Sequence, residues 1–293
     1  MPDRPTVGFI GLGHQGRRLV DRLMLAPFPV ALWARRPEAL DPYRDSGTTM
    51  ASSAGSLAAM CQIVCVCVPD ETAIDEVMRG ADGVLKGLSP GSTLLIHSTV
   101  RPEVCRDLAA QASRAGAAVI DAPVSNFSHQ PRRHIGEAEQ MDKRTATLTA
   151  FVGGSREAVE KCRSVLDAVA DRVFHLGPVG AGQIGKLINN LMFFAGVAAS
   201  FDLLSAGQRL DLSPLELASA IQHASGRSAA LEAVTDHYDL SDLPESLARF
   251  RQDFGHLMAK DTEAVRSVLD DVERLGTSIA LLIDIAATFG DPT

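Results

Sequence analysis

The sequence predicts an α/β domain with a doubly wound parallel sheet, followed by an all-helical domain that a long helix joins to the first. Three observations support this fold class. A short apolar strand runs into a glycine-rich turn at the N-terminus, continuous apolar runs then alternate with helical segments as far as Leu176, and no strand pattern follows Gly182. We therefore expect one domain over residues 1–178 and a second over residues 179–293.

The composition is that of a globular protein. The 293 residues are 46% hydrophobic, which is enough to form one large core or two moderate ones. Charged residues make up 22% of the chain, close to the average for folded proteins. The net charge of −8 and the sequence pI of about 5.5 argue against a nucleic-acid-binding surface.

The five cysteines form no metal-ligand pattern, and their odd number argues against a disulfide framework. Cys65 and Cys67 alternate with valines, as small hydrophobic residues of a buried strand do. The first five residues open no signal peptide, and the long apolar helix is expected to be too short and too interrupted to span a membrane. We expect a cytoplasmic protein with no membrane partner and no metal.

The first functional motif is the run of three glycines after the strand Thr6–Ile10. Gly11 allows a tight turn, Gly13 allows a pyrophosphate to approach the backbone, and Gly16 lets the following helix pack closely on the strand. The helix over Arg17–Leu25 then presents its positive N-terminus to the phosphates. This predicts a Rossmann dinucleotide site, against the alternative of a strand–turn–helix without a ligand. We assign to the cofactor Gly11, Leu12, Gly13, His14, Gln15 and Gly16.

The end of the second strand, Val30–Ala34, predicts which dinucleotide binds. An acidic residue here would accept a hydrogen bond from the ribose 2′-hydroxyl of NAD. The chain instead has Ala34 followed by Arg35 and Arg36, and guanidinium groups pair well with a 2′-phosphate. We therefore predict NADP(H) in preference to NAD(H), the alternative being that one or both arginines are merely solvated.

Two further predicted strands end in polar or proline-containing segments. Gln62–Val68 is followed by Pro69 and a helix over Glu71–Arg79, and Thr93–His97 is followed by Ser98 and Thr99. Ligands of such sheets bind beyond the carboxyl ends of the strands. Ser98 and Thr99 are therefore candidate cofactor contacts or, equally, N-caps of the helix that follows Pro102.

The middle of the chain contains one segment without a clean apolar period. Residues Ser128–Arg144 carry two histidines and many charges, and we interpret them as an exposed loop. His129 and His134 have no carboxylate or cysteine at a metal-ligand spacing, so a solvated loop is favoured over a metal site. The remaining elements of the first domain are expected at Ala117–Asp121, Leu148–Gly153, Ser155–Ala170 and Arg172–Leu176.

The second domain is predicted to begin with one long helix over Gly182–Gln208, about 40 Å at 1.5 Å per residue. Because this helix is apolar on more than one face, it must be buried on more than one side. The helix carries three polar residues near its start, namely Lys186, Asn189 and Asn190. Further helices are expected at Pro214–His223, Gly226–Val234, Ser246–Arg266 and Ile279–Phe289.

Four motifs together resemble the β-hydroxyacid dehydrogenases, a family that includes 3-hydroxyisobutyrate, tartronate semialdehyde and glyoxylate/succinic semialdehyde enzymes and, more distantly, 6-phosphogluconate dehydrogenase. The motifs span nearly the whole chain. They are Gly11-x-Gly13-x-x-Gly16, Asp121-Ala-Pro-Val-Ser125, Gly177-x-x-Gly180-x-Gly182-x-x-x-Lys186-x-x-Asn189-Asn190 and Lys260-Asp261.

The resemblance implies roles for the matched positions. Lys186 matches the catalytic lysine, and Asn190 matches the asparagine that helps to place the substrate. Ser125 falls in the segment that binds the substrate carboxylate. The positions that match cofactor contacts of the family are Val68, Pro69, Thr99 and Lys260. The resemblance also implies a homodimer in which the long helix packs.

The chemistry agrees with the implied role of Lys186. Hydride transfer to or from an alcohol needs a group that takes or supplies the hydroxyl proton. A lysine with the reference pKa of about 10.4 must be shifted down to act as a base near neutral pH, and burial beside an oxidised nicotinamide acts in that direction. Asn190, four residues later, lies on the same helix face. The alternative for Lys186 is a surface lysine.

The chain departs from the family pattern after Ser125. Two glycines of the pattern are replaced by Asn126 and Phe127, and about a dozen extra residues precede Thr147. Glycine lets backbone N–H groups approach a small carboxylate, so Asn and Phe predict a narrowed or re-aimed pocket. The inserted loop is then either a lid or a contact for a larger substrate.

The sequence therefore predicts an NADP(H)-dependent oxidoreductase that interconverts a hydroxy acid and its semialdehyde or keto form, with Lys186 as the acid/base. One alternative is an imine reductase of the same fold, although such enzymes typically lack this lysine. Another is a regulator that binds NADPH without catalysis.

Overall fold

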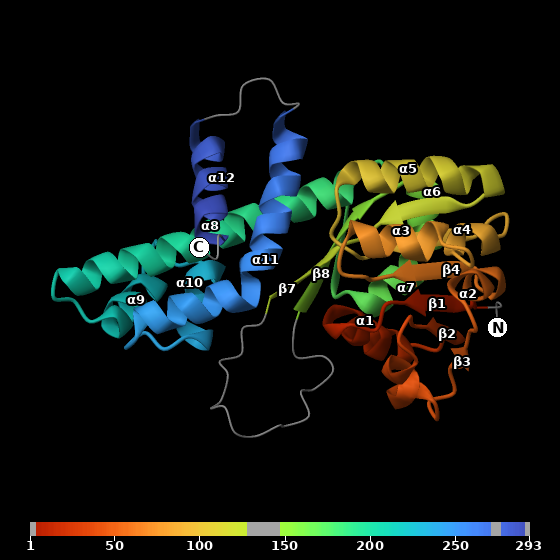
Figure 1. The fold of residues 1–293 in the computed structure, drawn as a ribbon, viewed down its shortest axis with the longest axis horizontal. Helices are drawn as coiled ribbons and strands as arrows, with labels where there is room; N and C mark the ends of the chain where they lie inside the picture. The colour runs from red at the N-terminus through yellow and green to blue at the C-terminus, as the bar shows by residue number, and fades with distance from the viewer. Residues whose placement is uncertain (1–3, 128–146, 271–276, 291–293) are drawn as a thin grey trace. The chain divides into compact units, whose positions relative to one another are not determined.

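The computed structural model describes residues 4–127, 147–270 and 277–290 (Figure 1). These residues form two compact units, which we call the first unit (4–127 and 147–186) and the second unit (187–270 and 277–290). The division falls inside the long helix, after Lys186. The domain boundary inferred from the sequence, between residues 178 and 179, lies just ahead of that helix.

The first unit is built on a nine-stranded sheet. Its strands are β1 (Val7–Ile10), β2 (Val30–Trp33), β3 (Thr49–Met50), β4 (Ile63–Val66), β5 (Thr93–Ile96), β6 (Ala118–Asp121), β7 (Val124–Phe127), β8 (Thr147–Gly153) and β9 (Arg172–Gly177). The order across the sheet is β3-β2-β1-β4-β5-β6-β8-β7, with β9 also paired to β8. The crossover between β1 and β4 creates the change of direction at which doubly wound sheets bind their ligands.

The sheet is mostly parallel, as predicted, but β8 runs antiparallel to both β6 and β7. The strand β7 was not expected from the sequence. It forms because Val124 pairs with Ala150 and Ser125 with Thr149, two stretches that are joined by the long insertion. The segment that contains Ser125 is therefore held in a strand ladder.

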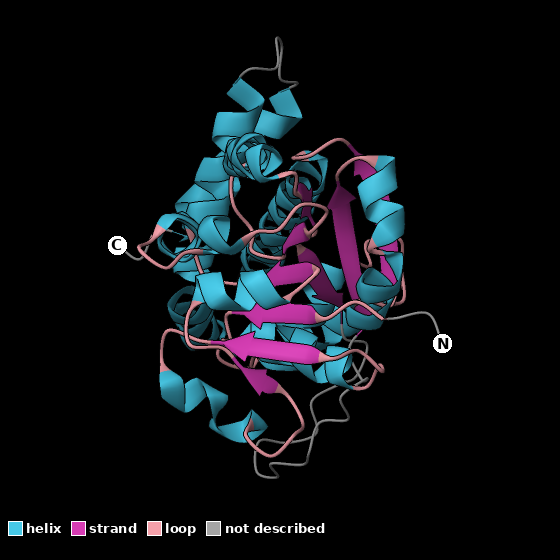
Figure 2. Cartoon of the chain, turned by 90° about the vertical axis from the view of Figure 1, so that its right-hand side faces the viewer, coloured by secondary structure: helices cyan, strands magenta, loops and turns pink. Residues whose placement is uncertain are grey.

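Helices cover both faces of the sheet (Figure 2). Those of the first unit are η1 (Pro37–Tyr43, a 3-10 helix), α1 (His14–Met24), α2 (Ala54–Met60), α3 (Glu71–Arg79), α4 (Val84–Gly87), α5 (Pro102–Ala112), η2 (Ser113–Ala115, 3-10), α6 (Arg156–Lys161) and α7 (Arg163–Val169). Alternate strand residues enter two cores: Phe9 packs with α1 and α7, and Ile10 with α2, α3 and α5. The single helix expected over Ser155–Ala170 is broken at Cys162, whose backbone leaves the helical region.

The second unit is all helical, as predicted. Helix α8 (Ala181–Arg209) begins in the first unit and continues into the second, where it packs with α9 (Pro214–Gln222), α10 (Ala229–His237), α11 (Leu243–Asp270) and α12 (Thr277–Gly290). The aromatic rings of Phe201, Tyr238, Phe250 and Phe289 meet with centroids 5.7 to 6.0 Å apart. These rings join α8, α11 and α12 in one core.

Helix α8 corrects the expectation that the long apolar helix is too short and too interrupted to span a membrane. With 29 residues and a mean hydropathy of 1.5 over its most apolar window, it is long and apolar enough to cross a membrane by length and composition alone. Half of that window is buried inside the protein, as in the core helix of a globular fold. The expectation of no membrane partner therefore stays a prediction.

All five cysteines are free, and only Cys67 is not fully buried. Burial raises the pKa of the Cys61 and Cys67 thiols to about 12, so neither forms a thiolate near neutral pH. The cysteines are therefore packing residues rather than nucleophiles.

Candidate functional site

The glycine-rich turn has the geometry of a dinucleotide-binding loop. Gly11 has a φ of 96°, which favours glycine, and a Cβ on Gly16 would overlap the Gly11 carbonyl oxygen. A Cβ on Gly13 would instead meet no described atom within 4 Å. The backbone between β1 and α1 is thus packed on one side and open at Gly13, which fits a phosphate at the start of α1.

The other residues assigned to this turn differ in exposure. The Leu12 side chain is buried in the core, and its carbonyl accepts a hydrogen bond from Arg17 Nε at 3.1 Å. His14 is exposed, and partial burial together with nearby Arg18 lowers the pKa of its imidazole. Gln15 is half-buried, and its Nε2 has no hydrogen-bond partner among the described residues. Because its side chain is buried, Leu12 can contact a ligand only through its backbone, whereas His14 and Gln15 have at least partly accessible side chains.

Arg35 and Arg36 lie just after β2, and both side chains are more than 70% exposed. Arg35 Nη1 lies 2.8 Å from Glu76 Oε2 of α3, and Arg36 Nε lies 4.0 Å from Glu38 Oε1. The carboxylate beside Arg35 comes from 41 residues further along the chain, so the local sequence gave no sign of it. A 2′-phosphate bound here would have to compete with Glu76 for Arg35.

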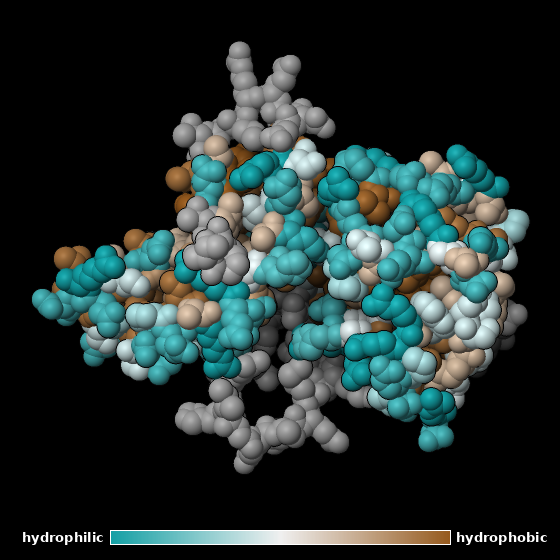
Figure 3. All heavy atoms as spheres, in the orientation of Figure 1, coloured by the Kyte–Doolittle hydropathy of each residue, from teal (hydrophilic) through white to brown (hydrophobic). Residues whose placement is uncertain are grey.

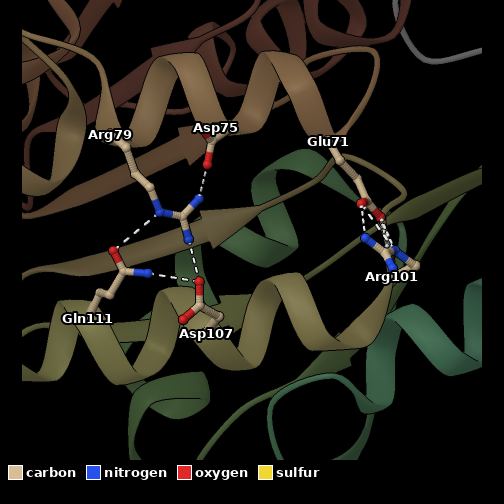
Figure 4. A network of polar contacts seen from close by, with 6 residues as sticks. All are labelled: Glu71, Asp75, Arg79, Arg101, Asp107 and Gln111. Atoms are coloured by element: carbon tan, nitrogen blue, oxygen red, sulfur yellow. Dashed lines mark hydrogen bonds and ion pairs between the residues drawn. The ribbon is translucent and has the colours of Figure 1, made fainter.

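The segments that follow β4 and β5 are tied together. The backbone N–H of Val68 donates to Ser98 Oγ at 2.8 Å. Glu71, at the start of α3, accepts from the Arg101 backbone N–H at 2.8 Å and from Arg101 Nη2 at 2.7 Å (Figure 4). Arg101 is also the N-cap residue of α5, so the alternative of Ser98 or Thr99 as that cap is wrong.

The same two helices are joined a second time further along their length (Figure 4). Arg79 of α3 pairs with Asp75 on its own helix and with Asp107 of α5 at 2.5 Å, and its Nε donates to Gln111 at 3.3 Å. The two contacts together hold α3 parallel to α5. Three predicted cofactor residues follow the paired strands β4 and β5 in the first unit, namely Val68, Pro69 and Thr99. The hydrogen bonds and ion pairs between α3 and α5 hold the segments that contain them together.

Asp121, at the end of β6, is fully buried and binds the start of α8. Its Oδ1 accepts from the Gly180 backbone N–H at 2.7 Å, and its Oδ2 accepts from the Gln183 backbone N–H at 2.8 Å. Burial raises the pKa of the Asp121 carboxyl, while the hydrogen bonds from Gly180 and Gln183 act in the opposite direction. The carboxylate therefore takes the place of a local N-cap for α8.

The Gln183 side chain is also fully buried and reaches the segment after β5. Its Oε1 accepts from the Val100 backbone N–H at 3.1 Å, and its Nε2 donates to the Ser98 carbonyl at 2.9 Å. Neither Asp121 nor Gln183 was among the predicted site residues. The sequence could have pointed to both residues, because Asp121 opens the motif that contains Ser125 and Gln183 lies three residues before Lys186 in the glycine–lysine motif.

Lys186 and Asn190 are both buried, each 8% exposed, and lie one turn apart on α8. Within the second unit, Asn190 Nδ2 donates to Asp261 Oδ2 of α11 at 2.6 Å. Lys260 Nζ lies 3.3 Å from the other oxygen of the same carboxylate. Asp261 was predicted only as part of the Lys260-Asp261 motif. The structure shows that its carboxylate orients the Asn190 side chain.

Of the predicted substrate residues, Ser125 is half-buried in β7. The backbone of Asn126 and Phe127 continues that strand, opposite Leu148 and Thr147. The insertion with His129 and His134 lies outside the described residues. Within the described part of the chain, no group of three or more histidine, cysteine or acidic residues is placed to hold a metal ion.

Comparison with known families assigns both parts of the chain. Residues 6–177 match the NAD-binding domain of 6-phosphogluconate dehydrogenase, and residues 180–288 match the NAD-binding domain of NADP-dependent 3-hydroxyisobutyrate dehydrogenase. The chain is 30% identical over 262 residues to the mitochondrial 3-hydroxyisobutyrate dehydrogenase of Bos taurus, covering 89% of this chain and 74% of that one. It is also 30% identical to the NAD-dependent L-serine dehydrogenase of Pseudomonas aeruginosa, over 87% of this chain and 82% of the relative.

Solved structures agree. The 3-hydroxyisobutyrate dehydrogenase of Mycobacterium tuberculosis with L-serine superposes with a TM-score of 0.77 at 25% identity, covering 98% of this chain and 94% of that one. Psf3 in complex with NADP+ and 2-OPP gives 0.74 at 26% identity, covering 96% and 92%. An imine reductase from Pseudomonas sp. shares the fold at 17% identity, with a TM-score of 0.57 over 97% of this chain and 92% of that one. The chain belongs to the β-hydroxyacid dehydrogenase family and is a nicotinamide-dependent oxidoreductase that acts on a CH–OH group.

Proposed function

We propose that the protein is an NADP(H)-dependent dehydrogenase that interconverts a hydroxy acid and its semialdehyde or keto form, with Lys186 as the general acid/base. The observation that carries the proposal is the position of Lys186. It is a buried lysine in the first turns of α8 and belongs to the same compact unit as the glycine-rich turn. A buried lysine in this position is better suited to proton transfer than a solvated surface lysine would be, which supports a chemical role.

The nicotinamide supplies or accepts the hydride when it is bound. Lys186 takes the proton from the substrate hydroxyl during oxidation and returns it during reduction, at Nζ. Asn190, on the same face of α8, holds the substrate oxygen without adding charge. Asp261 keeps the Asn190 carboxamide in one orientation through the 2.6 Å hydrogen bond. The Ser125 segment binds the substrate carboxylate.

The preference for NADP(H) rests on Arg35 and Arg36, which present two exposed guanidinium groups after β2. The similarity to Psf3, solved with NADP+, supports the same cofactor. Because Arg35 is shared with Glu76, we expect a moderate preference and not an absolute one.

The substrate is a hydroxy acid related to those of the similar enzymes, which are named for 3-hydroxyisobutyrate and L-serine. Asn126 and Phe127 replace two glycines of the family pattern in the segment that binds the substrate carboxylate. We therefore expect the substrate carboxylate to bind in a different position from that of small substrates such as 3-hydroxyisobutyrate. The five free cysteines support a cytoplasmic location, and the exposed apolar residues of α8 support a homodimer.

The test is a steady-state screen that follows nicotinamide absorbance. The wild-type enzyme is assayed with NADP+ and NAD+ against 3-hydroxyisobutyrate, L-serine and larger hydroxy acids, and with NADPH against semialdehydes and cyclic imines. We expect turnover of a hydroxy acid and its oxidised partner, with kcat/KM for NADP+ about tenfold above that for NAD+, the scale of one charge-assisted contact.

Three results would count against the proposal. Turnover of cyclic imines alone would make the protein an imine reductase. Binding of NADPH with no turnover of any compound would make it a regulator. A preference for NAD+ would refute the role of the two arginines while leaving the reaction type intact.

A further inference from the structure

The N–H groups of a helix's first turn have no acceptors within the helix and need them from elsewhere. A neighbouring Ser, Thr, Asp or Asn is the preferred source of such an acceptor. In α8 it comes from Asp121, which precedes Gly180 by 59 residues and Gln183 by 62. The start of the helix that carries Lys186 is therefore fastened directly to the carboxyl end of β6.

Two glycines make room for this carboxylate. A Cβ on Gly182 would lie 2.8 Å from Asp121 Oδ2, and a Cβ on Gly153 would lie 2.5 Å from Asp121 Oδ1. Both distances are shorter than real Cβ contacts allow. A Cβ on Gly182 would also overlap the Phe151 carbonyl oxygen, so this position requires glycine on both counts.

Gln183 adds a second attachment. Its carboxamide bonds to the Val100 N–H and the Ser98 carbonyl, and Ser98 Oγ in turn accepts from the Val68 N–H. One continuous set of hydrogen bonds therefore runs from the segment after β4, through the segment after β5, to the first turn of α8. The segments it joins are those predicted to contact the nicotinamide cofactor.

Lys186 follows Gln183 by less than one turn of the same helix, so any shift of the first turn also moves the lysine. Proton transfer requires Nζ within hydrogen-bond reach of the substrate hydroxyl, and a misplacement of about 1 Å can cost 100-fold in rate. We propose that Asp121 and Gln183 are positioning residues, which fix the first turn of α8, and with it Lys186, against the ends of β4, β5 and β6. This inference rests on the proposed function for the role of Lys186.

The main test variant is Gln183→Met, which keeps the side-chain length and removes the side-chain hydrogen bonds to Val100, Ser98 and Cys105. Asp121→Asn is the second variant, because it keeps one acceptor oxygen and places an N–H group against the donors of α8. The controls are Gln208→Met and Asp202→Asn, which make the same changes at exposed positions further along α8. Thermal unfolding shows that each variant is folded before it is assayed, and Gln183→Met carries the test if Asp121→Asn does not fold.

Three measurements follow on each variant. For Gln183→Met we expect faster amide hydrogen exchange in a peptide covering residues 180–187 and an NADPH dissociation constant within about threefold of wild type. With the hydroxy acid found by the screen above, we expect kcat to fall about 10- to 100-fold while KM changes little. Both controls should match the wild type in all three.

The inference is overturned if Gln183→Met exchanges faster but keeps the wild-type kcat, or if its exchange does not change. It is also overturned if the variant loses NADPH affinity in parallel with its rate, because the network would then serve cofactor binding. The failure of the proposed function looks different. Lys186→Ala would keep its turnover, or no hydroxy acid would react, while the exchange measurement would still report on the hydrogen-bond network.

Discussion

At the scale of single residues, His97 shows how the sheet can carry a buried ionisable group. It lies directly after β5, 3% exposed, with Nδ1 2.8 Å from the Ala122 carbonyl and its ring stacked at 6.2 Å on Phe9. Nε2 is buried with no partner among the described residues. Burial lowers the pKa of His97 to about 4, against the weaker opposing effect of the hydrogen bond to Ala122.

This pKa predicts an acid-sensitive stability. Above pH 6.5 the imidazole is neutral in both the folded and the unfolded state, so His97 does not lower the free energy of unfolding. As the pH falls from 6.5 towards 4, His97 becomes protonated in the unfolded chain but stays neutral in the folded protein. The free energy of unfolding therefore decreases by up to about 3 kcal/mol over this range. Urea unfolding at several pH values measures the change.

The variant His97→Phe keeps the ring and removes the titration. We expect it to be less stable than wild type at pH 7, because the Ala122 carbonyl loses its donor, and to show a shallower loss of stability between pH 6.5 and 4. The exposed His256→Gln is the control and should keep the wild-type slope. Equal slopes in His97→Phe and wild type would contradict the assignment.

The sequence was informative about residues whose roles depend on local pattern. The glycines of the first turn could be assigned individually because their spacing alone dictates the packing of strand and helix. Asp121, Gln183 and Asp261 could not be assigned, because each acts on a partner 59 to 85 residues away that only folding brings near. Glu76 beside Arg35 was missed for the same reason.

At the scale of elements, the packing at the start of α8 predicts a strong effect of Gly182→Ala. The added methyl group would overlap the Phe151 carbonyl oxygen and crowd the Asp121 carboxylate, and neither can move without shifting β8 or β6. We expect a loss of stability of about 1–3 kcal/mol, seen as a lower unfolding temperature, together with reduced activity.

Gly185→Ala is the matched control. Its methyl group would meet chiefly the end of the Leu176 side chain, which is 48% exposed and can move away. Because alanine also favours the helix over glycine, this variant should be at least close to wild type in stability. Equal destabilisation by both substitutions would show that Gly182 has no special role.

The elements themselves were predicted where the apolar pattern is long. Helix α3 and the strands β1, β2, β4, β5 and β6 were found to within a few residues, and α8 nearly in full. The break at Cys162 was not predicted, because nothing in the local sequence interrupts the helical pattern. Strand β7 was missed because its four residues depend on pairing with β8 across the insertion.

At the scale of the whole molecule, α8 leaves apolar side chains exposed on the second unit. Ile188, Met192 and Leu203 are 44%, 67% and 66% exposed, and Leu210 and Leu212 follow at the end of the helix. Figure 3 shows hydrophobic atoms on the surface of the helical second unit. Exposed patches of this kind mark interaction surfaces.

We therefore expect a homodimer that buries this face of α8. Light scattering after gel filtration should give twice the chain mass of 31.1 kDa for the wild type. The double variant Met192→Glu, Leu203→Glu should give the mass of a single chain, because four charges would be buried in the dimer. Gln208→Glu, which adds a charge on the same helix at a polar position, should remain dimeric. A wild-type protein with the mass of one chain would refute the expectation.

We propose that Lys186 is the acid/base of this nicotinamide-dependent enzyme. The most direct measurement is the kcat of Lys186→Ala with the hydroxy acid found by the screen, together with its NADPH dissociation constant by fluorescence. Lys161→Ala, an exposed lysine of the same unit, is the control. We predict that kcat falls by about 10²- to 10⁴-fold in Lys186→Ala while NADPH affinity stays within about threefold, and that the control is unchanged. A Lys186→Ala enzyme that binds NADPH and turns over at close to the wild-type rate would contradict the account.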